Sequence, residues 1–203
     1  MKAVVYHADG PIAEKFPKGT YEKLFYGLRT NLNDMGIELI HLTTIGHEGW
    51  GDKTYWFKGK PEHIVWNREQ FWIEFLKEYA KDDETYWCCE PDSRLKAQIP
   101  PLSGDLAILR RNDAVAITPS WRLAKRAALP FFEEVITYYD TEKKDWNGDS
   151  TGWIKMWEQM GRPNIGEVKY KGLNIELRDY NLYSTKDSRY TTQHKAQNKL
   201  SLI

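Results

Sequence analysis

The sequence has no excess of either charge and no long apolar segment, and each absence excludes a class of protein. Lysine plus arginine number 29 and aspartate plus glutamate also number 29, so the formal net charge is zero. A neutral chain has no overall field that recruits nucleic acid or an anionic membrane, so a polyanion must be bound by a local patch. No apolar run reaches the ~18 residues of a membrane span, and the N-terminus lacks a signal peptide's apolar core. We therefore expect a cytoplasmic protein.

Cysteine is nearly absent, and the two that occur, Cys88 and Cys89, are adjacent in a predicted buried strand. Successive strand residues point to opposite faces, which excludes a disulfide or a metal site between them and makes them small core residues. No repeat, low-complexity tract or linker interrupts the 203 residues, so we expect one domain. The final ~20 residues are polar and are typical of a disordered tail.

Aromatic residues, by contrast, are plentiful: nine Trp, twelve Tyr and seven Phe. Such rings can form a stacking surface for bases or sugars, or they can fill the core, which is the commoner use. The composition therefore leaves open a module that binds a nucleotide or a sugar by stacking.

Apolar spacing predicts alternating strands and helices. A strand at Lys2–His7, a helix at Tyr21–Met35 and a strand at 37–42 form a βαβ unit. Further predicted elements are a loop at 46–60, a helix at 67–80, strands at 86–89, 105–109 and 114–118, a helix at 121–136 broken at Pro130, a helix to Met160 capped by Asp149 or Ser150, and a hairpin at 167–177 around Lys171-Gly172. The alternation predicts an α/β domain with a mixed sheet.

The most informative segment is Tyr86-Trp87-Cys88-Cys89-Glu90-Pro91-Asp92-Ser93, in which an apolar run ends in two carboxylates. In extended backbone residues i and i+2 share a face, so Glu90 and Asp92 can converge on one hard cation at the strand's end. Such a pair can hold a metal-bound diphosphate. The alternative is a strand that runs into a polar turn at Pro91.

Three other segments flank this motif: Asn67-Arg68 before it, and Trp146-Asn147-Gly148-Asp149-Ser150 and His194-Lys195-Ala196-Gln197-Asn198-Lys199 after it. Their order resembles that of the GT-A fold glycosyltransferases, nucleotide-diphospho-sugar transferases in which a helix bearing an arginine precedes a strand ending in a DxD motif. The later segments resemble the Gly-Asp-Gln region and the His-x-x-Gly-x-x-Lys element of that family. Here Glu replaces the first Asp, Ser replaces Gln, Gln replaces Gly, and the last Lys comes one residue early.

The resemblance implies a single GT-A-like (Rossmann-like) α/β domain over residues 1–203, with a central mixed sheet flanked by helices. It implies a metal-dependent hexosyl- or pentosyltransferase that moves a sugar from a nucleotide-diphospho-sugar, with UDP as the expected nucleotide, to a hydroxyl acceptor. Glu90, Asp92 and His194 would hold Mn²⁺, or less favourably Mg²⁺, because an imidazole ligand prefers the softer ion. The tail, residues 185–203, would then close over the donor.

Further roles follow from the same resemblance. Arg68 and Lys199 would supply fixed positive charge on the donor side, where the departing diphosphate gains negative charge. Asp149 would position or deprotonate the acceptor hydroxyl. Asp9 can contact the base of the donor or simply form a turn, and Asp105 can line the sugar pocket or cap the turn before its strand.

The acceptor is open at this point. It can be a small molecule, a glycan or a protein, or a hydroxymethylated base in DNA, as for some bacteriophage enzymes, in which case the protein would act in the host cytoplasm. A basic stretch can contact a polyanionic acceptor or form a solvated helix face; it comprises Arg110, Arg111, Arg122, Lys125 and Arg126. The alternative function is a non-catalytic nucleotide- or sugar-binding module, which needs no convergent metal ligands.

Overall fold

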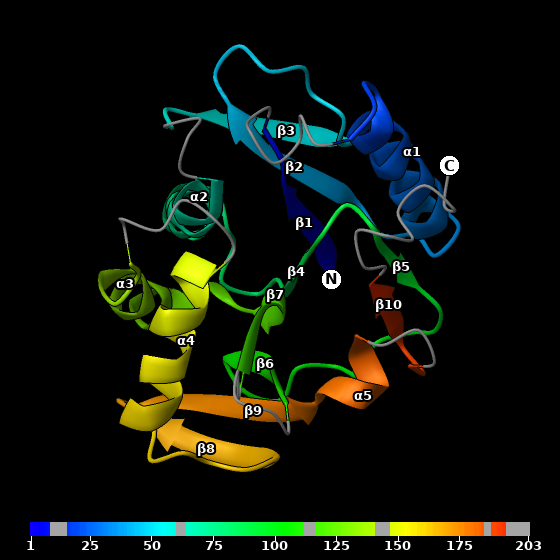
Figure 1. Cartoon of the computed structure of the whole chain (residues 1–203). Helices are drawn as coiled ribbons and strands as arrows, with labels where there is room; N and C mark the ends of the chain where they lie inside the picture. The colour runs from blue at the N-terminus through cyan, green and yellow to red at the C-terminus, as the bar shows by residue number, and fades with distance from the viewer. Residues whose placement is uncertain (9–15, 60–63, 112–116, 141–146, 185–187, 194–203) are drawn as a thin grey trace.

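The computed structural model describes residues 1–8, 16–59, 64–111, 117–140, 147–184 and 188–193. These residues form an eight-stranded sheet of order β3-β2-β1-β4-β7-β6-β9-β8 and a two-stranded sheet of β10 and β5 (Figure 1). The strands are β1 (Lys2–Tyr6), β2 (Leu39–Thr44), β3 (Lys53–Phe57), β4 (Tyr86–Cys89), β5 (Ser93–Leu95), β6 (Leu106–Arg110), β7 (Ile117–Ala124), β8 (Gly166–Tyr170), β9 (Leu173–Asp179) and β10 (Thr191–Gln193). The helices are α1 (Thr20–Asn33), α2 (Ile64–Glu78), the 3-10 helix η2 (Arg126–Ala128), α3 (Leu129–Thr137), α4 (Asn147–Gln159) and α5 (Tyr180–Tyr183).

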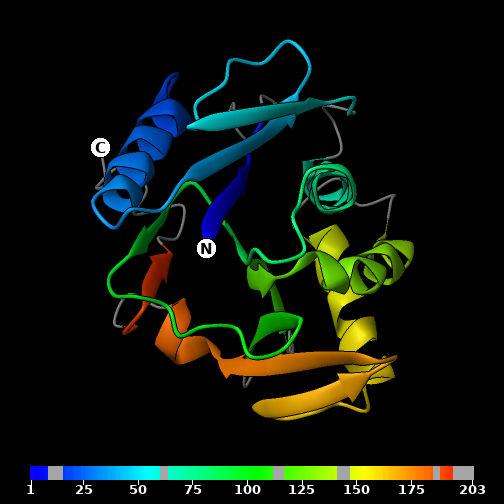
Figure 2. The same ribbon diagram turned by 180° about the vertical axis from the view of Figure 1, so that it is seen from behind.

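Strand β1 shows why both faces of the sheet are covered. Its residues alternate between two hydrophobic clusters: Val4 and Tyr6 pack with residues of α2, α3 and α4, whereas Ala3 and Val5 pack with residues of α1. Figures 1 and 2 show α2, α3 and α4 on one face of the sheet and α1 on the other. Because β1 pairs in parallel with β2 and β4, it is buried on both sides and has a continuous apolar sequence.

Strand β4 confirms the expectation for the two cysteines. Cys88 packs in the cluster under α2 and Cys89 in the cluster under α1, and both are free thiols. Burial raises the pKa of Cys88, and burial together with the charges of Cys88, Glu90 and Asp92 raises the pKa of Cys89 well above its ordinary value. Both side chains are therefore protonated core residues at neutral pH.

The second half of the sheet is mixed. Strand β7 is antiparallel to β4 and β6, β6 is parallel to β9, and β8 and β9 form the predicted hairpin. The two loop residues of that hairpin, Lys171 and Gly172, have φ angles of 48° and 86°, the positive values that a two-residue turn between strands requires. This half completes the α/β domain with a central mixed sheet that the sequence predicts.

Three regions differ from the predictions. Residues 121–124 belong to β7 instead of a helix, because Trp121 and Leu123 face one cluster while Ala124 faces the other, as a doubly buried strand requires. Part of the predicted loop at 46–60 is the edge strand β3. Part of the predicted disordered tail forms β10, where Thr191 is buried. None of the helices in the described ranges is long and apolar enough to cross a membrane.

Candidate active site

The carboxyl ends of the parallel strands β1, β2 and β4 gather at one edge of the sheet. Val5 and Cys89 are paired near the ends of β1 and β4, so the residues that follow them emerge side by side. Glu90 and Asp92 follow β4, and in open α/β sheets this edge is where ligands bind. The prediction that both carboxylates lie at the end of a central strand is confirmed.

The backbone at this point is a turn and not an extension of β4. The Ser93 amide donates to the Glu90 carbonyl at 2.9 Å, and the Glu90 amide donates to Ser93 Oγ at 3.2 Å. Pro91 and Asp92 therefore occupy the centre of the turn, as in the alternative reading of the motif, and the i, i+2 geometry of a strand does not apply. Asp92 is 2% exposed, so its carboxylate lies inside the protein.

Arg68 joins this turn to helix α4. One terminal nitrogen of its guanidinium, Nη1, donates to Glu90 Oε1 at 2.8 Å, and Nη2 donates to Asp149 Oδ2. Burial alone would lower the pKa of Arg68, but the charges of Asp149 and Glu90 raise it above its ordinary value. The predicted donor-side arginine, one predicted metal ligand and the predicted acceptor-side carboxylate are thus in direct contact.

Asp149 is held in the first turn of α4. The helix begins at Asn147, so Asp149 lies within the helix and is not its N-cap, contrary to the capping expectation. A carboxylate in the first turn is favoured by the helix dipole. Burial nevertheless raises the pKa of Asp149, and pairing with Arg68 only partly opposes this rise. A buried carboxylate of raised pKa is suited to accept a proton or a hydrogen bond from a hydroxyl group.

A second set of buried polar residues lies next to Arg68, and sequence reasoning missed it. Arg122 of β7 donates to Glu69 Oε2 at 2.9 Å, with both side chains 0% exposed. Glu69 Oε2 also accepts from the Tyr139 hydroxyl at 2.9 Å, and the Tyr139 oxygen accepts from Trp153 Nε1 at 2.8 Å. The expectation that Arg122 belongs to a solvated or polyanion-binding stretch is therefore wrong.

The rings around Arg122 explain how a cation is tolerated there. Its guanidinium carbon lies 5.0 Å from the centroids of Trp72 and Phe132 and 5.6 Å from that of Trp153. Cation–π attraction and the pair with Glu69 both offset the cost of removing the charge from water. The apolar neighbours Trp121, Leu123 and Ala124 are the local sign of burial at Arg122, but Lys125 and Arg126 directly after them give the segment the composition of a solvated stretch.

Asp105 is not part of the group formed by Arg68, Glu90 and Asp149, called the Arg68 group from here on. Leu106, Ala124 and Tyr86 are aligned across the sheet, so Asp105 lies at the edge where β4 begins and not where it ends. Its Oδ2 accepts from the Asn174 amide at 2.9 Å. This contact fits the turn-capping alternative. The remaining predicted site residues, Asp9, His194 and Lys199, lie outside the described residues.

Aromatic and histidine rings line the end of β1. The His7 ring is stacked between Tyr21, at a centroid distance of 4.3 Å, and Trp50, at 5.3 Å. His41 Nε2 lies 3.1 Å from the His7 carbonyl, and burial lowers the pKa of His41 to about 3. Here the rings stack on one another, which accounts for part of the aromatic content as packing.

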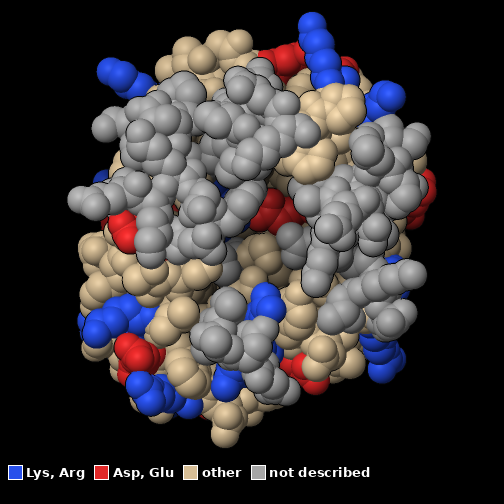
Figure 3. All heavy atoms as spheres, viewed as in Figure 1, with Lys and Arg blue, Asp and Glu red and all other residues tan. Residues whose placement is uncertain are grey.

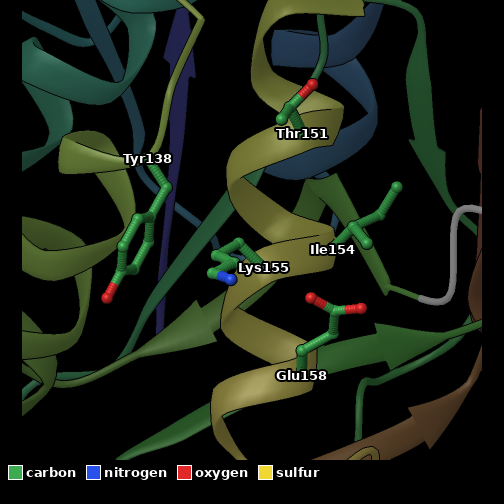
Figure 4. Close-up of a pocket in the computed structure, with 5 residues that line it drawn as sticks. All are labelled: Tyr138, Thr151, Ile154, Lys155 and Glu158. Atoms are coloured by element: carbon green, nitrogen blue, oxygen red, sulfur yellow. The ribbon is translucent and has the colours of Figure 1, made fainter.

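A separate pocket of about 360 Å³ lies between the end of α3 and the outer side of α4 (Figure 4). Its lining residues are Tyr138, Thr151, Ile154, Lys155 and Glu158. Figure 4 shows the side chain of Tyr138 on the segment after α3 and the other four on α4, extending in different directions without a common focus. No member of the Arg68 group lines this pocket. Within the described residues no three His, Cys, Asp or Glu side chains are grouped to hold a metal, and the third predicted ligand lies outside them.

Comparison with solved structures identifies the fold. A glycosyltransferase involved in the glycosylation of the major capsid of PBCV-1 superposes with a TM-score of 0.60, covering 100% of this chain and 99% of that chain at 10% identity. Mouse xyloside xylosyltransferase 1, in its apo form, gives a TM-score of 0.57 over 97% and 98% of the two chains at 6% identity. No protein-family model and no curated protein sequence matches the chain. The chain therefore has the GT-A fold of glycosyltransferases, as its motif order predicts.

Proposed function

We propose that the protein is a metal-dependent glycosyltransferase, which moves a sugar from a nucleotide-diphospho-sugar, most simply a UDP-sugar, to a hydroxyl acceptor. The observation that carries the proposal is the contact of Arg68 with both Glu90 and Asp149 at the carboxyl edge of the parallel strands. A non-catalytic stacking module has no use for one half-buried and one buried carboxylate held by a single arginine at this edge. The GT-A fold supports the same conclusion.

In this proposal Glu90 and Asp92, with His194, hold the metal, and Mn²⁺ suits two carboxylates plus an imidazole better than Mg²⁺ does. The ion supplies Lewis-acid stabilisation of the departing diphosphate. Arg68 fixes the orientation of Glu90 and keeps a positive charge beside it. Asp149 positions or deprotonates the acceptor hydroxyl, for which its raised pKa suits it.

The pairing of β5 with β10 supports a role for the tail. Strand β5 starts at the residue after Asp92, and β10 ends at the residue before His194. The two strands are antiparallel, with Gln193 opposite Ser93. The chain therefore leaves β10 next to the turn from Glu90 to Ser93, called the carboxylate turn from here on. A tail that supplies His194 to the metal and Lys199 to the diphosphate requires this position. We treat residues 1–203 as one domain, with 185–203 as the closing segment.

On the donor side, we assign Asp9 to the base. Strand β1 ends at Tyr6, and the rings of His7, Tyr21 and Trp50 stack at that end. We leave Asp105 out of the proposed site because it lies at the opposite end of its strand.

For the acceptor we propose a sugar or protein hydroxyl in preference to a hydroxymethylated base in bacteriophage DNA. Arg122 is buried, which removes one charge from the stretch that favoured DNA. On the face shown in Figure 3, Lys and Arg alternate with Asp and Glu over the described part, instead of forming a continuous basic surface.

The test is a panel of nucleotide-diphospho-sugars, assayed for hydrolysis or transfer with Mn²⁺, with Mg²⁺ and with a chelator. We expect one donor to be consumed in a Mn²⁺-dependent reaction. A matched pair of variants locates the ion: Glu90→Gln should lose the activity, whereas Glu167→Gln, on the exposed strand β8, should retain it. Stable nucleotide binding without turnover of any donor would favour the non-catalytic binding module.

A further inference from the structure

We infer that Glu69, Arg122, Tyr139 and Trp153 form a positioning unit that sets Arg68 between Glu90 and Asp149. This inference rests on the proposed function for its kinetic consequence, but its structural claim stands on the contacts themselves. None of the four residues lies at the carboxylate turn, and all four are buried: Glu69, Arg122 and Trp153 are 0% exposed and Tyr139 is 8% exposed.

The contacts connect helices α2 and α4 at two places. Arg68 and Glu69 are successive residues of α2: the first bonds to Glu90 and Asp149, and the second to Arg122 and Tyr139. Asp149 and Trp153 are one turn apart on α4, so they project from the same side of that helix. Each helix is therefore held at two neighbouring points, once through Arg68–Asp149 and once through Glu69–Tyr139–Trp153.

Two contacts between α2 and α4 fix the orientation of one helix relative to the other, whereas a single contact does not. A single contact between α2 and α4 permits rotation of either helix about it, and Arg68 would then reach only one of its two carboxylates. With Tyr139 of the segment after α3 bonded to both helices, the guanidinium is aimed at Glu90 and Asp149 together. Glu69 is held in place because its partner Arg122 belongs to the central sheet, opposite Cys88 of β4.

One side of the Tyr139 ring lies in close contact with helix α4. A Cβ atom built on Gly152, between Asp149 and Trp153, would lie 2.5 Å from Tyr139 Cδ1. The tyrosine ring therefore packs directly against the backbone of α4, at the turn that carries Asp149. Its hydroxyl is the atom that connects the two helices, and removing it also takes away the acceptor of Trp153 Nε1.

The inference is tested with Tyr139→Phe, which keeps the ring and removes the shared hydroxyl. Its matched control is Tyr138→Phe, one residue earlier, where the lost hydroxyl bonds to Glu134 at the surface of α3. Substitutions of Arg122 are avoided because they would leave Glu69 buried without its cation and could prevent folding. Circular dichroism and thermal unfolding establish that both variants fold.

With the donor that the wild type consumes, Tyr139→Phe should reduce kcat by about tenfold or more, because displacement of a positioning group by ~1 Å can cost as much as 100-fold. The donor KM should stay within about twofold, and Tyr138→Phe should match the wild type. The effect must also be smaller in an Asp149→Asn background, because part of it acts through the contact of Arg68 with Asp149. A merely structural role would give the same loss in both backgrounds, and that result would overturn the inference.

Crystal structures of the two variants separate this inference from the proposed function. We expect Tyr139→Phe to show Arg68 withdrawn from Glu90 or from Asp149, and Tyr138→Phe to show both contacts retained. If the wild type consumes no donor, the proposed function fails, yet these structures still decide the positioning claim. Unchanged contacts of Arg68 in Tyr139→Phe would refute it.

Discussion

Replacing Arg68 with alanine should destabilise the protein in a pH-dependent way. The change leaves Glu90 and Asp149 without their shared cation. Breaking a buried ion pair from one side costs ~3–5 kcal/mol. The Glu90 side chain is 15% exposed and can be partly solvated, whereas that of Asp149 is 4% exposed and cannot. We therefore expect the free energy of unfolding to fall by about 3 kcal/mol at neutral pH, the lower limit of that range.

The pH dependence has a definite sign. Burial already raises the pKa of Asp149 in the folded protein, and Arg68 opposes the rise, so removing Arg68 must raise it further. For an acid whose folded pKa exceeds its unfolded value, stability falls as the pH rises from the unfolded pKa of ~3.9 to the folded pKa. The cost is complete above the folded pKa and vanishes below the unfolded one. The deficit of Arg68→Ala should therefore be largest near neutral pH and shrink on acidification.

The assay is urea unfolding followed by tryptophan fluorescence, for which the nine Trp provide signal. The control is Arg162→Ala, which removes an exposed pair with Glu158 at 3.0 Å, four residues apart. That pair should be worth no more than ~0.5 kcal/mol and show little pH dependence. Equal losses in the two variants, or a deficit of Arg68→Ala that grows on acidification, would refute the account of Arg68 as a buried bridge.

Three further predictions concern turnover. Asp92→Ala should abolish Mn²⁺-stimulated turnover and leave the fold intact; unchanged metal dependence would place the ion elsewhere. Asp149→Asn should reduce transfer far more than donor binding, as measured by single-turnover kinetics and calorimetry, and a collapse of donor affinity would move Asp149 to the donor site. Truncation after Gln193 keeps β10 paired with β5 and should yield a folded protein that has lost most donor affinity, with His194→Ala reproducing part of the loss. A truncated protein working at the full rate would show that the tail is dispensable.

The sequence predicts the architecture because burial imposes simple periodicities. The apolar run of β1, the stripe of α1 and the two cysteines of β4 each have the residue pattern that their surroundings require. The apolar periodicity is weaker where an element is only partly buried. Strand β3 lies at the edge of the sheet and is only partly buried. The sequence of Lys53–Phe57 therefore does not show the alternation that would distinguish a strand from the loop before it. Short strands such as β5 and β10 depend on long-range pairing, which no local pattern encodes.

The site was predictable to the extent that its residues belong to motifs. Arg68, Glu90 and Asp149 were selected by motif order, and the structure brings them into contact. Tyr139 and Glu69 belong to no motif, because their hydrogen bonds form only when α2, α3 and α4 pack together. For Arg122, local composition pointed to solvent, since its burial depends on rings contributed by three separate helices.

The most direct test of the central claim is a crystal structure with UDP and Mn²⁺, recorded at a wavelength where manganese scatters anomalously. The account predicts an anomalous peak at the carboxylate turn, within ~2.0–2.3 Å of oxygen atoms of Glu90 and Asp92, the usual range for oxygen and nitrogen ligands of such ions. It also predicts that the diphosphate of the bound UDP coordinates the same ion. A peak elsewhere, or UDP bound with no metal at Glu90 and Asp92, would contradict the proposed active site.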